Sequence, residues 1–65
     1  MIEIARIFTI ATSNRRDIVR RLMACCETFK HLTFADAFAQ YRYFEQAGLV
    51  KKCDGYLVIY HDCEN

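Results

Sequence analysis

The chain has 65 residues, of which 54% are hydrophobic and 14% aromatic, and a formal net charge of +1. A chain this short forms one domain (residues 1–65), and its high apolar content excludes an intrinsically disordered protein. The balanced charge gives no overall bias toward nucleic acids or membranes, and no run of about 18 apolar residues predicts a transmembrane helix.

The first twelve residues, MIEIARIFTIAT, fit two periods. Alternating apolar residues, together with the β-propensity of isoleucine and threonine, favour a strand. A helical stripe of Ile4, Ile7, Phe8 and Ala11 is the alternative for residues 2–11. We expect the strand, and because it would be nearly apolar on both faces, we expect it to be central in a sheet or covered.

A helix is predicted from Arg15 to Phe29. Asn14 is a suitable N-cap, and the carboxylate of Asp17 lies in the first turn, near the positive end of the helix dipole. An apolar stripe at helical spacing is formed by Ile18, Val19, Leu22, Met23, Cys26 and Phe29.

The main charge cluster of the chain is four arginines within seven residues: Arg15, Arg16, Arg20 and Arg21. One interpretation is a solvated helix face whose aliphatic stems cover apolar neighbours. The other is a patch that binds phosphate or another acid, because guanidinium groups match the geometry of phosphate oxygens.

Four cysteines make disulfides or a zinc site the first alternatives to consider. Cys25 and Cys26 are adjacent on the predicted helix, so their side chains point about 100° apart, and no CxxC spacing occurs. His61 and Cys63 share a strand face, but Cys53 points to the opposite one. We therefore expect free, reduced cysteines in a cytoplasmic protein, with no metal and no cofactor.

A second predicted helix begins after Thr33, a good N-cap, and ends before Gly48, which favours the left-handed conformation that follows helices. Its apolar stripe consists of Phe34, Ala37, Phe38, Tyr41 and Phe44. Its opposite face consists of Ala35, Asp36, Ala39, Gln40, Tyr43 and Ala47. This opposite face is small and flat, and we expect Tyr43 to be exposed at its middle.

A β-hairpin is predicted around Asp54-Gly55, because this dipeptide favours a two-residue type I′ turn. A turn of this length pairs Cys53 with Tyr56, Lys51 with Val58, Val50 with Ile59, and Leu49 with Tyr60. Val50, Leu57 and Ile59 then share the face expected to join the core. A turn of three or four residues is the alternative and would change this register.

The other face of the hairpin is unusually apolar. It would carry Leu49, Tyr56, Val58 and Tyr60, with the stems of Lys51 and Cys53. Such a patch would be near or above the usual limit for a monomer, so we expect this face to be a protein interface. A homodimer in which two copies bury the patch reciprocally is the expected assembly.

Together these elements predict an α+β fold, a two-layer β-α-α-β-β domain with two amphipathic helices on one face of a small antiparallel sheet. The stretch from Thr33 to Ile59 resembles the second half of a winged-helix DNA-binding domain, in which a recognition helix ends in "L…L..AGLV" and runs straight into a wing hairpin. The matching residues here are Tyr41, Phe44, Ala47, Gly48, Leu49 and Val50, with Asp54-Gly55 as the wing tip.

The winged-helix resemblance implies DNA binding. The exposed positions of the recognition helix would be Ala35, Asp36, Ala39, Gln40 and Tyr43. Glutamine is a residue type that pairs with adenine, so Gln40 would lie near bases, as would Tyr43, whose hydroxyl would also reach a phosphate. Arg16, Arg20 and Arg21 would contact phosphates.

Two segments are also similar to pieces of the short Kil-type proteins of temperate phages, which inhibit cell division. They are FTIAT at Phe8–Thr12 and FADAFAQYRYF at Phe34–Phe44. This resemblance implies a protein of phage or mobile-element origin.

The sequence indicates a non-enzymatic protein. It suggests no Ser/His/Asp or Cys/His pairing, and two glycines are too few for a glycine-rich phosphate loop. Two functions stay open: a small regulator that binds DNA, and a modulator or inhibitor that binds a protein target. The second would act through the flat face around Tyr43 or the apolar sheet face around Tyr60.

Overall fold

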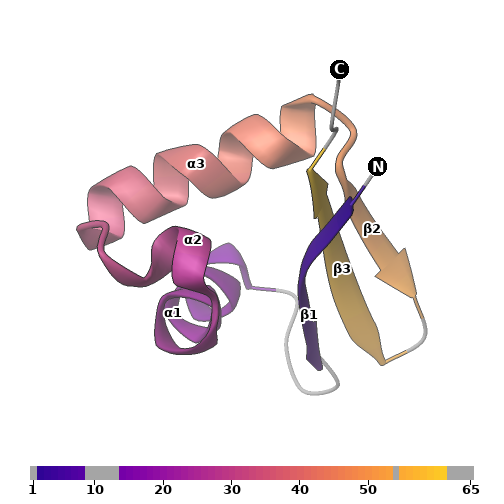
Figure 1. Cartoon of the computed structure of the whole chain (residues 1–65), viewed down its shortest axis with the longest axis horizontal. Helices are drawn as coiled ribbons and strands as arrows, with labels where there is room; N and C mark the ends of the chain where they lie inside the picture. Colours follow the sequence, from indigo (N-terminus) through magenta and orange to yellow (C-terminus); the bar gives the residue numbers. More distant parts are fainter. Residues whose placement is uncertain (1, 9–13, 54, 62–65) are drawn as a thin grey trace.

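The computed structural model of the chain describes residues 2–8, 14–53 and 55–61. It has the predicted α+β architecture, with a strand, a helical segment and a C-terminal hairpin in chain order (Figure 1). The elements are β1 (Ile2–Phe8), α1 (Arg15–Cys25), α2 (Glu27–Lys30), α3 (Phe34–Gln46), β2 (Val50–Cys53) and β3 (Tyr56–His61).

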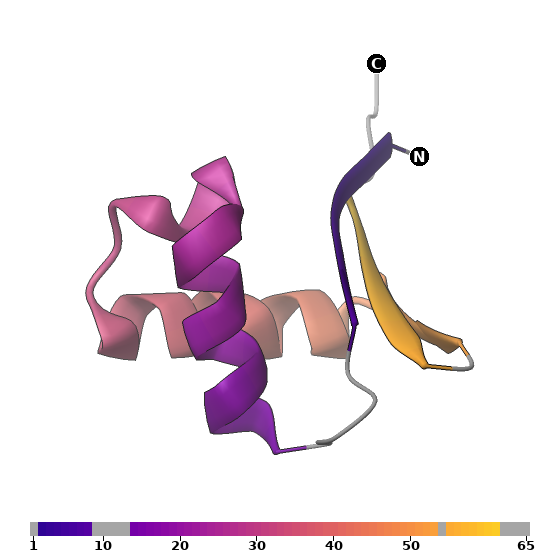
Figure 2. The same ribbon diagram turned by 90° about the horizontal axis from the view of Figure 1, so that it is seen from below.

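The three strands form one antiparallel sheet in the order β1-β3-β2. All three helices lie on the same side of this sheet, as Figure 2 shows. The result is the predicted two-layer arrangement. The opposite side of the sheet, which we call the outer sheet face, has no helix over it in the part of the chain that the structure describes.

The predicted hairpin register is confirmed over the described strands. Val50 pairs with Ile59, Lys51 with Val58, Lys52 with Leu57, and Cys53 with Tyr56. The backbone of Tyr60 donates a hydrogen bond of 2.8 Å to the Leu49 carbonyl, which continues the same pairing. Asp54 lies outside the described residues, and Gly55 has the positive φ of 77° that a tight turn requires.

The N-terminal segment is the expected strand over Ile2–Phe8, while residues 9–13 lie outside the described part. Of the two expected positions, the central one is wrong, because β1 lies at an edge of the sheet, and the covered one holds for one face only. One face is covered, since Ile7 is buried opposite Leu57. The other face is open, and Phe8 is 65% exposed. The apolar residues of β1 thus contribute both to the buried core and to the open outer sheet face.

The helix predicted from Arg15 to Phe29 is interrupted at Cys26, whose backbone is extended with φ −114° and ψ 121°. Neither glycine nor proline marks the break, so its cause is tertiary packing rather than local propensity. The buried Cys26 thiol lies 3.5 Å from the Ile4 carbonyl of β1. The Phe29 ring lies 6.1 Å from the Phe44 ring of α3. The break allows both residues to reach these partners.

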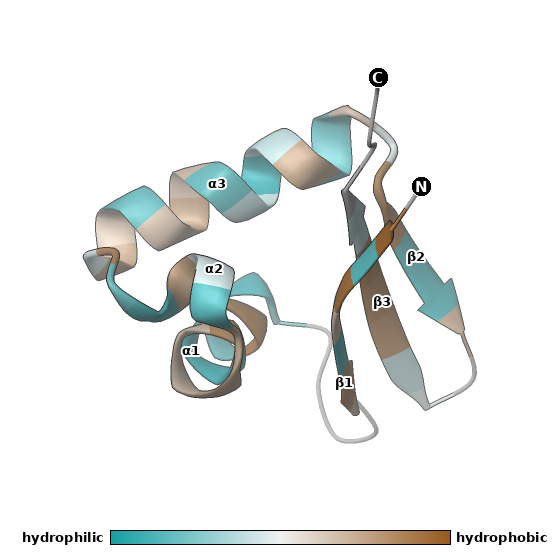
Figure 3. Cartoon of the chain, viewed as in Figure 1, coloured by the Kyte–Doolittle hydropathy of each residue, from teal (hydrophilic) through white to brown (hydrophobic). Residues whose placement is uncertain are grey.

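The core lies between the helices and the inner face of the sheet. Figure 3 shows that the middle of β3 is hydrophobic and that hydrophobic and hydrophilic residues alternate along α3. The buried cluster is Ile7, Ile18, Val19, Leu22, Cys26, Phe29, Ala37, Tyr41, Phe44, Leu57 and Ile59. It contains most of the apolar stripes predicted for the helices. Burial of each large side chain stabilises the fold by about 1.5–3 kcal/mol relative to exposure.

Both ends of α3 follow the signals in the sequence. The Thr33 side chain accepts a hydrogen bond of 3.1 Å from the Asp36 backbone, as an N-cap does. After the helix, Gly48 adopts a φ of 75°, and the Leu49 backbone donates 2.9 Å to the Phe44 carbonyl. This closure turns the chain directly into β2 and so fixes the hairpin relative to α3.

The Thr33 cap gives the first testable prediction. Thr33→Ala should lower the free energy of unfolding by about 1 kcal/mol, because the Asp36 N–H loses its acceptor. Thr33→Ser keeps a hydroxyl and should retain most of that stability. Urea denaturation of the two variants measures the difference. Equal losses in both would contradict a capping role for the hydroxyl.

Candidate functional site

The outer face of α3 is open to solvent as predicted, and Tyr43 is 59% exposed at its middle. Gln40 is half-buried, and the remaining members of this face are exposed: Ala35, Asp36, Ala39 and Ala47. The small side chains leave the backbone of α3 close to the surface. A flat partner such as the floor of a DNA groove or another helix can therefore approach closely.

The arginines predicted to contact phosphates lie in two different places in the structure. Arg16 lies against the N-terminal half of α3, and the Arg20 guanidinium lies 5.3 Å above the Phe34 ring. Arg20 also forms an ion pair of 3.7 Å with Asp17. Arg21 points elsewhere, because its Nη1 donates a hydrogen bond of 2.9 Å to the Phe8 carbonyl at the end of β1. Arg16 and Arg20 therefore adjoin α3, and Arg21 does not.

Gln40 and Arg16 do not flank the same side of α3. Gln40 follows Ala35 by five positions, which turns it about 140° around the helix axis from the flank that faces Arg16. Tyr43 lies between these two flanks. The predicted nucleic-acid contacts therefore span the whole outer side of α3 rather than one edge.

An apolar hollow of about 480 Å³ lies where α1 meets the start of α3. Its lining residues are Arg16, Phe34, Ala35 and Phe38. The two phenylalanine rings are 5.9 Å apart and half-buried. The hollow therefore combines aromatic walls with a cationic rim, an arrangement suited to an apolar side chain next to an acidic group.

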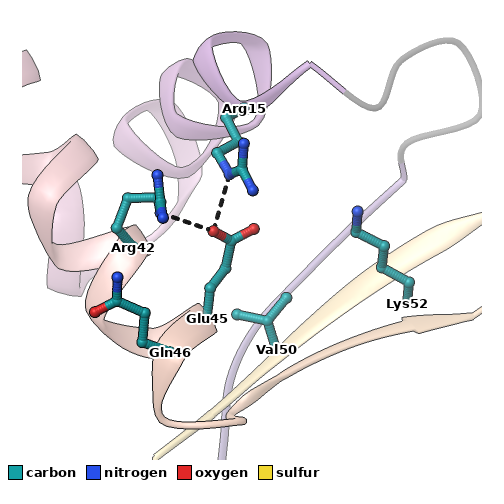
Figure 4. Close-up of a pocket in the computed structure, with 6 residues that line it drawn as sticks. All are labelled: Arg15, Arg42, Glu45, Gln46, Val50 and Lys52. Atoms are coloured by element: carbon teal, nitrogen blue, oxygen red, sulfur yellow. Dashed lines mark hydrogen bonds and ion pairs between the residues drawn. The ribbon is translucent and has the colours of Figure 1, made fainter.

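A second hollow, of about 520 Å³, lies where α1, α3 and β2 meet, and we call it the basic hollow (Figure 4). Glu45 stands at its centre with a side chain that is only 18% exposed. The Arg15 Nε donates a hydrogen bond of 2.9 Å to Glu45 Oε1, and the Arg42 Nε lies 3.2 Å from the same oxygen. The full lining is Arg15, Arg42, Glu45, Gln46, Val50 and Lys52.

Sequence reasoning did not identify the basic hollow. The spacing of Arg42 and Glu45 signals a local ion pair on one helix. Arg15, however, is thirty positions from Glu45, and Lys52 belongs to another element. No local pattern connects residues so distant, so only the packing of α1 against α3 and of the hairpin against α3 brings them together.

Tyr41 lies in the core close to the basic hollow and is completely buried. Its hydroxyl has no well-aligned hydrogen-bond partner among the described side chains. Burial raises the pKa of the Tyr41 hydroxyl to about 12, the Glu45 carboxylate adds to the rise, and the Arg15 guanidinium opposes it. Tyr41 therefore stays neutral over the whole physiological range.

The outer sheet face carries the aromatic residues predicted for it. The Tyr56 ring lies 5.2 Å from the Arg6 guanidinium and 6.4 Å from the Phe8 ring, which it meets edge to face. Val58, between Arg6 and Lys51 in the strand register, is only 2% exposed. The half-buried Tyr60 lies on the same face as Phe8, Tyr56 and Val58.

One residue predicted for that face belongs elsewhere. Leu49 packs against the core cluster, because it precedes β2 and follows the Gly48 turn that holds it beneath α3. The apolar part of the outer sheet face is therefore made of Phe8, Tyr56 and Tyr60, with Val58 beneath them.

The described residues contain no group of three His, Cys, Asp or Glu side chains placed to hold a metal ion. The cysteines described, Cys25, Cys26 and Cys53, are free, and Cys63 lies outside the described part. None of the helices in the described part is long and apolar enough to cross a membrane.

Comparison with known proteins found no match to this chain among family models, curated proteins or solved structures. The class of protein it belongs to must therefore be argued from its own fold and surface.

Tyr41 gives a prediction about pH. Because its folded-state pKa lies above the ordinary value of 10.0, tyrosinate forms first in the unfolded chain. The free energy of unfolding is fully retained below about pH 10 and falls as the pH rises toward about 12. Tyr41→Phe should be nearly neutral at about pH 8 and should remove this part of the alkaline loss.

Urea denaturation at about pH 8 and about pH 11 measures the effect, with the exposed Tyr43→Phe as the matched control. The control should lose stability in parallel with the wild type. A Tyr41→Phe protein that loses as much stability at high pH as the wild type would show that ionisation of the buried Tyr41 hydroxyl does not cause the alkaline loss.

Proposed function

We propose that this protein is a small non-enzymatic regulator that binds DNA in the manner of a winged-helix domain. The observation that carries the proposal is the order and packing of its last elements. α1 and α3 cross on one side of the sheet, and α3 passes through the Gly48 turn directly into the hairpin of β2 and β3 (Figures 1 and 2). In this proposal α3 is the recognition helix and the hairpin is the wing.

The outer face of α3 suits the major groove, which admits one helix and displays base edges to it. Tyr43 is the large exposed side chain of this face, and its hydroxyl can donate to a base edge or a phosphate. Gln40 contacts a base from the flank on which it lies, with adenine as its preferred partner. Asp36 is the acid on this face, and its repulsion of phosphates makes the neighbouring cations necessary.

Those cations are Arg16 and Arg20, which stand beside the first turn of α3. They contact the phosphates that border the groove and fix the position of the helix within it. Arg21 has a different part, because its hydrogen bond to the Phe8 carbonyl ties α1 to β1. It is therefore a positioning residue of the domain in this proposal.

A modulator that binds a protein target is the second candidate, and the apolar hollow between α1 and α3 favours it. The Phe34 and Phe38 rings form a site for an apolar side chain, and Arg16 offers a partner to a neighbouring carboxylate. The similarity of two segments to Kil-type phage proteins agrees with such a role, and a phage or mobile-element origin is part of this second proposal.

For either function we propose a cytoplasmic homodimer. The support is the outer sheet face, where Phe8 is 65% exposed and Tyr60 is half-buried with no helix above them in the described part. Two copies that meet through this face would bury the apolar groups reciprocally. The two outer faces of α3 would then point away from each other and remain open for the partner.

DNA binding is tested by fluorescence anisotropy with a short random-sequence duplex over a range of salt concentrations. Arg16→Gln and Arg20→Gln should each weaken binding and lower the slope of log affinity against log salt by about 0.9. Tyr43→Ala should weaken binding with little change in melting temperature, because the side chain is exposed. Lys30→Gln, which removes the same charge from the exposed end of α2, is the matched control. Absence of binding at low salt would leave the protein-binding candidate.

The dimer is tested by sedimentation equilibrium at micromolar concentration. Tyr60→Glu should produce monomers, because it places a charge in the interface next to Glu3, its partner in the strand register. Tyr43→Glu makes the same change on α3 and should leave the dimer intact. A wild-type protein that is monomeric at all concentrations would exclude the proposed interface.

A further inference from the structure

The basic hollow holds more positive charge than its own structure needs. Arg15, Arg42 and Lys52 line it, and Glu45 is the acid among its lining residues. One carboxylate balances one of these three cations. No acidic group in the described part of the chain lies within ion-pair distance of Lys52. The hollow therefore keeps an excess of about two positive charges, which favours a bound anion.

Glu45 holds the two arginine side chains in place without using all of their hydrogen-bond donors. A single oxygen, Oε1, lies within 3.2 Å of the Nε atoms of both arginines. Figure 4 shows the two guanidinium groups converging on this carboxylate from different sides, with Lys52 on a third. Each guanidinium has five N–H donors, so the Nη groups remain available after the Nε contact. They form the planar fork that matches phosphate oxygens.

The surroundings also favour an anion. Arg15 is the first residue of α1, so this lining residue belongs to the first turn, at the positive end of an eleven-residue helix whose N-cap is Asn14. Val50 contributes an apolar wall, and the Glu45 side chain is largely withdrawn from water. Charges in such a partly buried place interact more strongly than they would in free solution.

The position of the hollow identifies the source of the anion. The hollow adjoins the outer face of α3, because Arg42 is next to Tyr43 in the helix and Gln46 follows Tyr43 by one turn. It is formed by α1, α3 and β2, the elements that bring the recognition helix and the wing together. Its central residue, Glu45, lies about 160° around the helix axis from Tyr43, so the hollow is on the flank of α3. A nucleic-acid strand that borders a groove filled by the outer face of α3 runs along that flank. A phosphate of that strand can then meet both arginines and the lysine.

We propose that the basic hollow is the binding site of one DNA backbone phosphate. Arg15, Arg42 and Lys52 bind the phosphate, and Glu45 positions the two arginines. The inference rests on the proposed DNA-binding function and adds to it a specific anchor between the recognition helix and the wing. It also gives Glu45 a defined task. Glu45 is a positioning residue that holds the two guanidinium groups while opposing the charge of the phosphate.

The test compares variants with opposite expected signs in duplex binding by fluorescence anisotropy. Lys52→Gln should lower the affinity severalfold and reduce the salt slope by about 0.9, and Arg15→Gln should do the same. Glu45→Gln should raise the affinity severalfold at low salt, because the repulsive charge is gone while an amide oxygen still accepts from Arg15. A purely structural ion cluster predicts no gain of affinity in Glu45→Gln.

Lys30→Gln is the matched control, because Lys30 is exposed at the end of α2 and is not among the lining residues of the basic hollow. It should leave affinity and slope close to those of the wild type. Lys52 has no ion-pair partner in the described part, so its variant tests the phosphate site without the loss of an internal ion pair. Thermal unfolding of each variant separates a change in binding from a change in folding.

The outcomes distinguish the two proposals. If Lys52→Gln and folded Arg15→Gln bind the duplex as the wild type does, the proposed phosphate site is excluded and the DNA-binding proposal stands. No duplex binding by the wild type at low salt would overturn both. Inorganic phosphate should compete only weakly, because one ion lacks the neighbouring contacts of a strand. Tight binding of inorganic phosphate in the hollow would assign the site to a free anion and overturn the DNA assignment.

Discussion

The structure depends on the burial of the inner side of α3. Tyr41 and Phe44 are almost completely enclosed, and they join the helical layer to the sheet in one cluster. An aromatic side chain of this kind buries about 150–250 Å², so these two positions carry a large share of the core of a small domain. Because α3 cannot rotate without losing this burial, its outer side is fixed as well. The exposure of Tyr43 and the shape of the basic hollow follow from residues that face the opposite way.

The parts of the fold that could be predicted from the sequence are those with a local cause. The Thr33 cap and the Gly48 turn each act within a few residues, and both have the expected geometry. The hairpin register follows from a two-residue turn and the alternation of side chains along a strand. The helical stripes follow from the periodicity of α-helices. Each of these signals lies within one element or between two neighbours in the chain.

The parts that could not be predicted depend on contacts between distant elements. Nothing near Cys26 signals a helix break, which becomes understandable only when Ile4 and Phe44 are placed against Cys26 and Phe29. Arg21 belongs to a basic cluster in the sequence, yet its partner is the carbonyl of Phe8. An apolar strand has the same sequence pattern at an edge of a sheet as in its centre, so the edge position of β1 was not predictable. For the candidate site, the exposed face of α3 was predictable and the basic hollow was not.

The basic hollow and the apolar hollow show how a small domain divides its surface. Both lie between α1 and α3, one toward the end of α3 and the other toward its start. Arginines from the first turn of α1 contribute to each, because the adjacent Arg15 and Arg16 reach opposite ends of the same flank of α3. A single helix crossing thus separates a charged recess from an aromatic one. Two kinds of partner chemistry are therefore available on the helical side of the domain.

The strand order has a consequence for how the protein avoids uncontrolled assembly. With β3 in the middle, both β1 and β2 are edge strands whose outward backbone groups could pair with another chain. β2 is short and carries two consecutive lysines, Lys51 and Lys52, and β1 has a shift of register between Glu3 and Ala5. Charges and irregularities of this kind discourage the extension of a sheet into fibres. Lys52 would then protect the isolated domain from aggregation through the same charge that it offers to a phosphate.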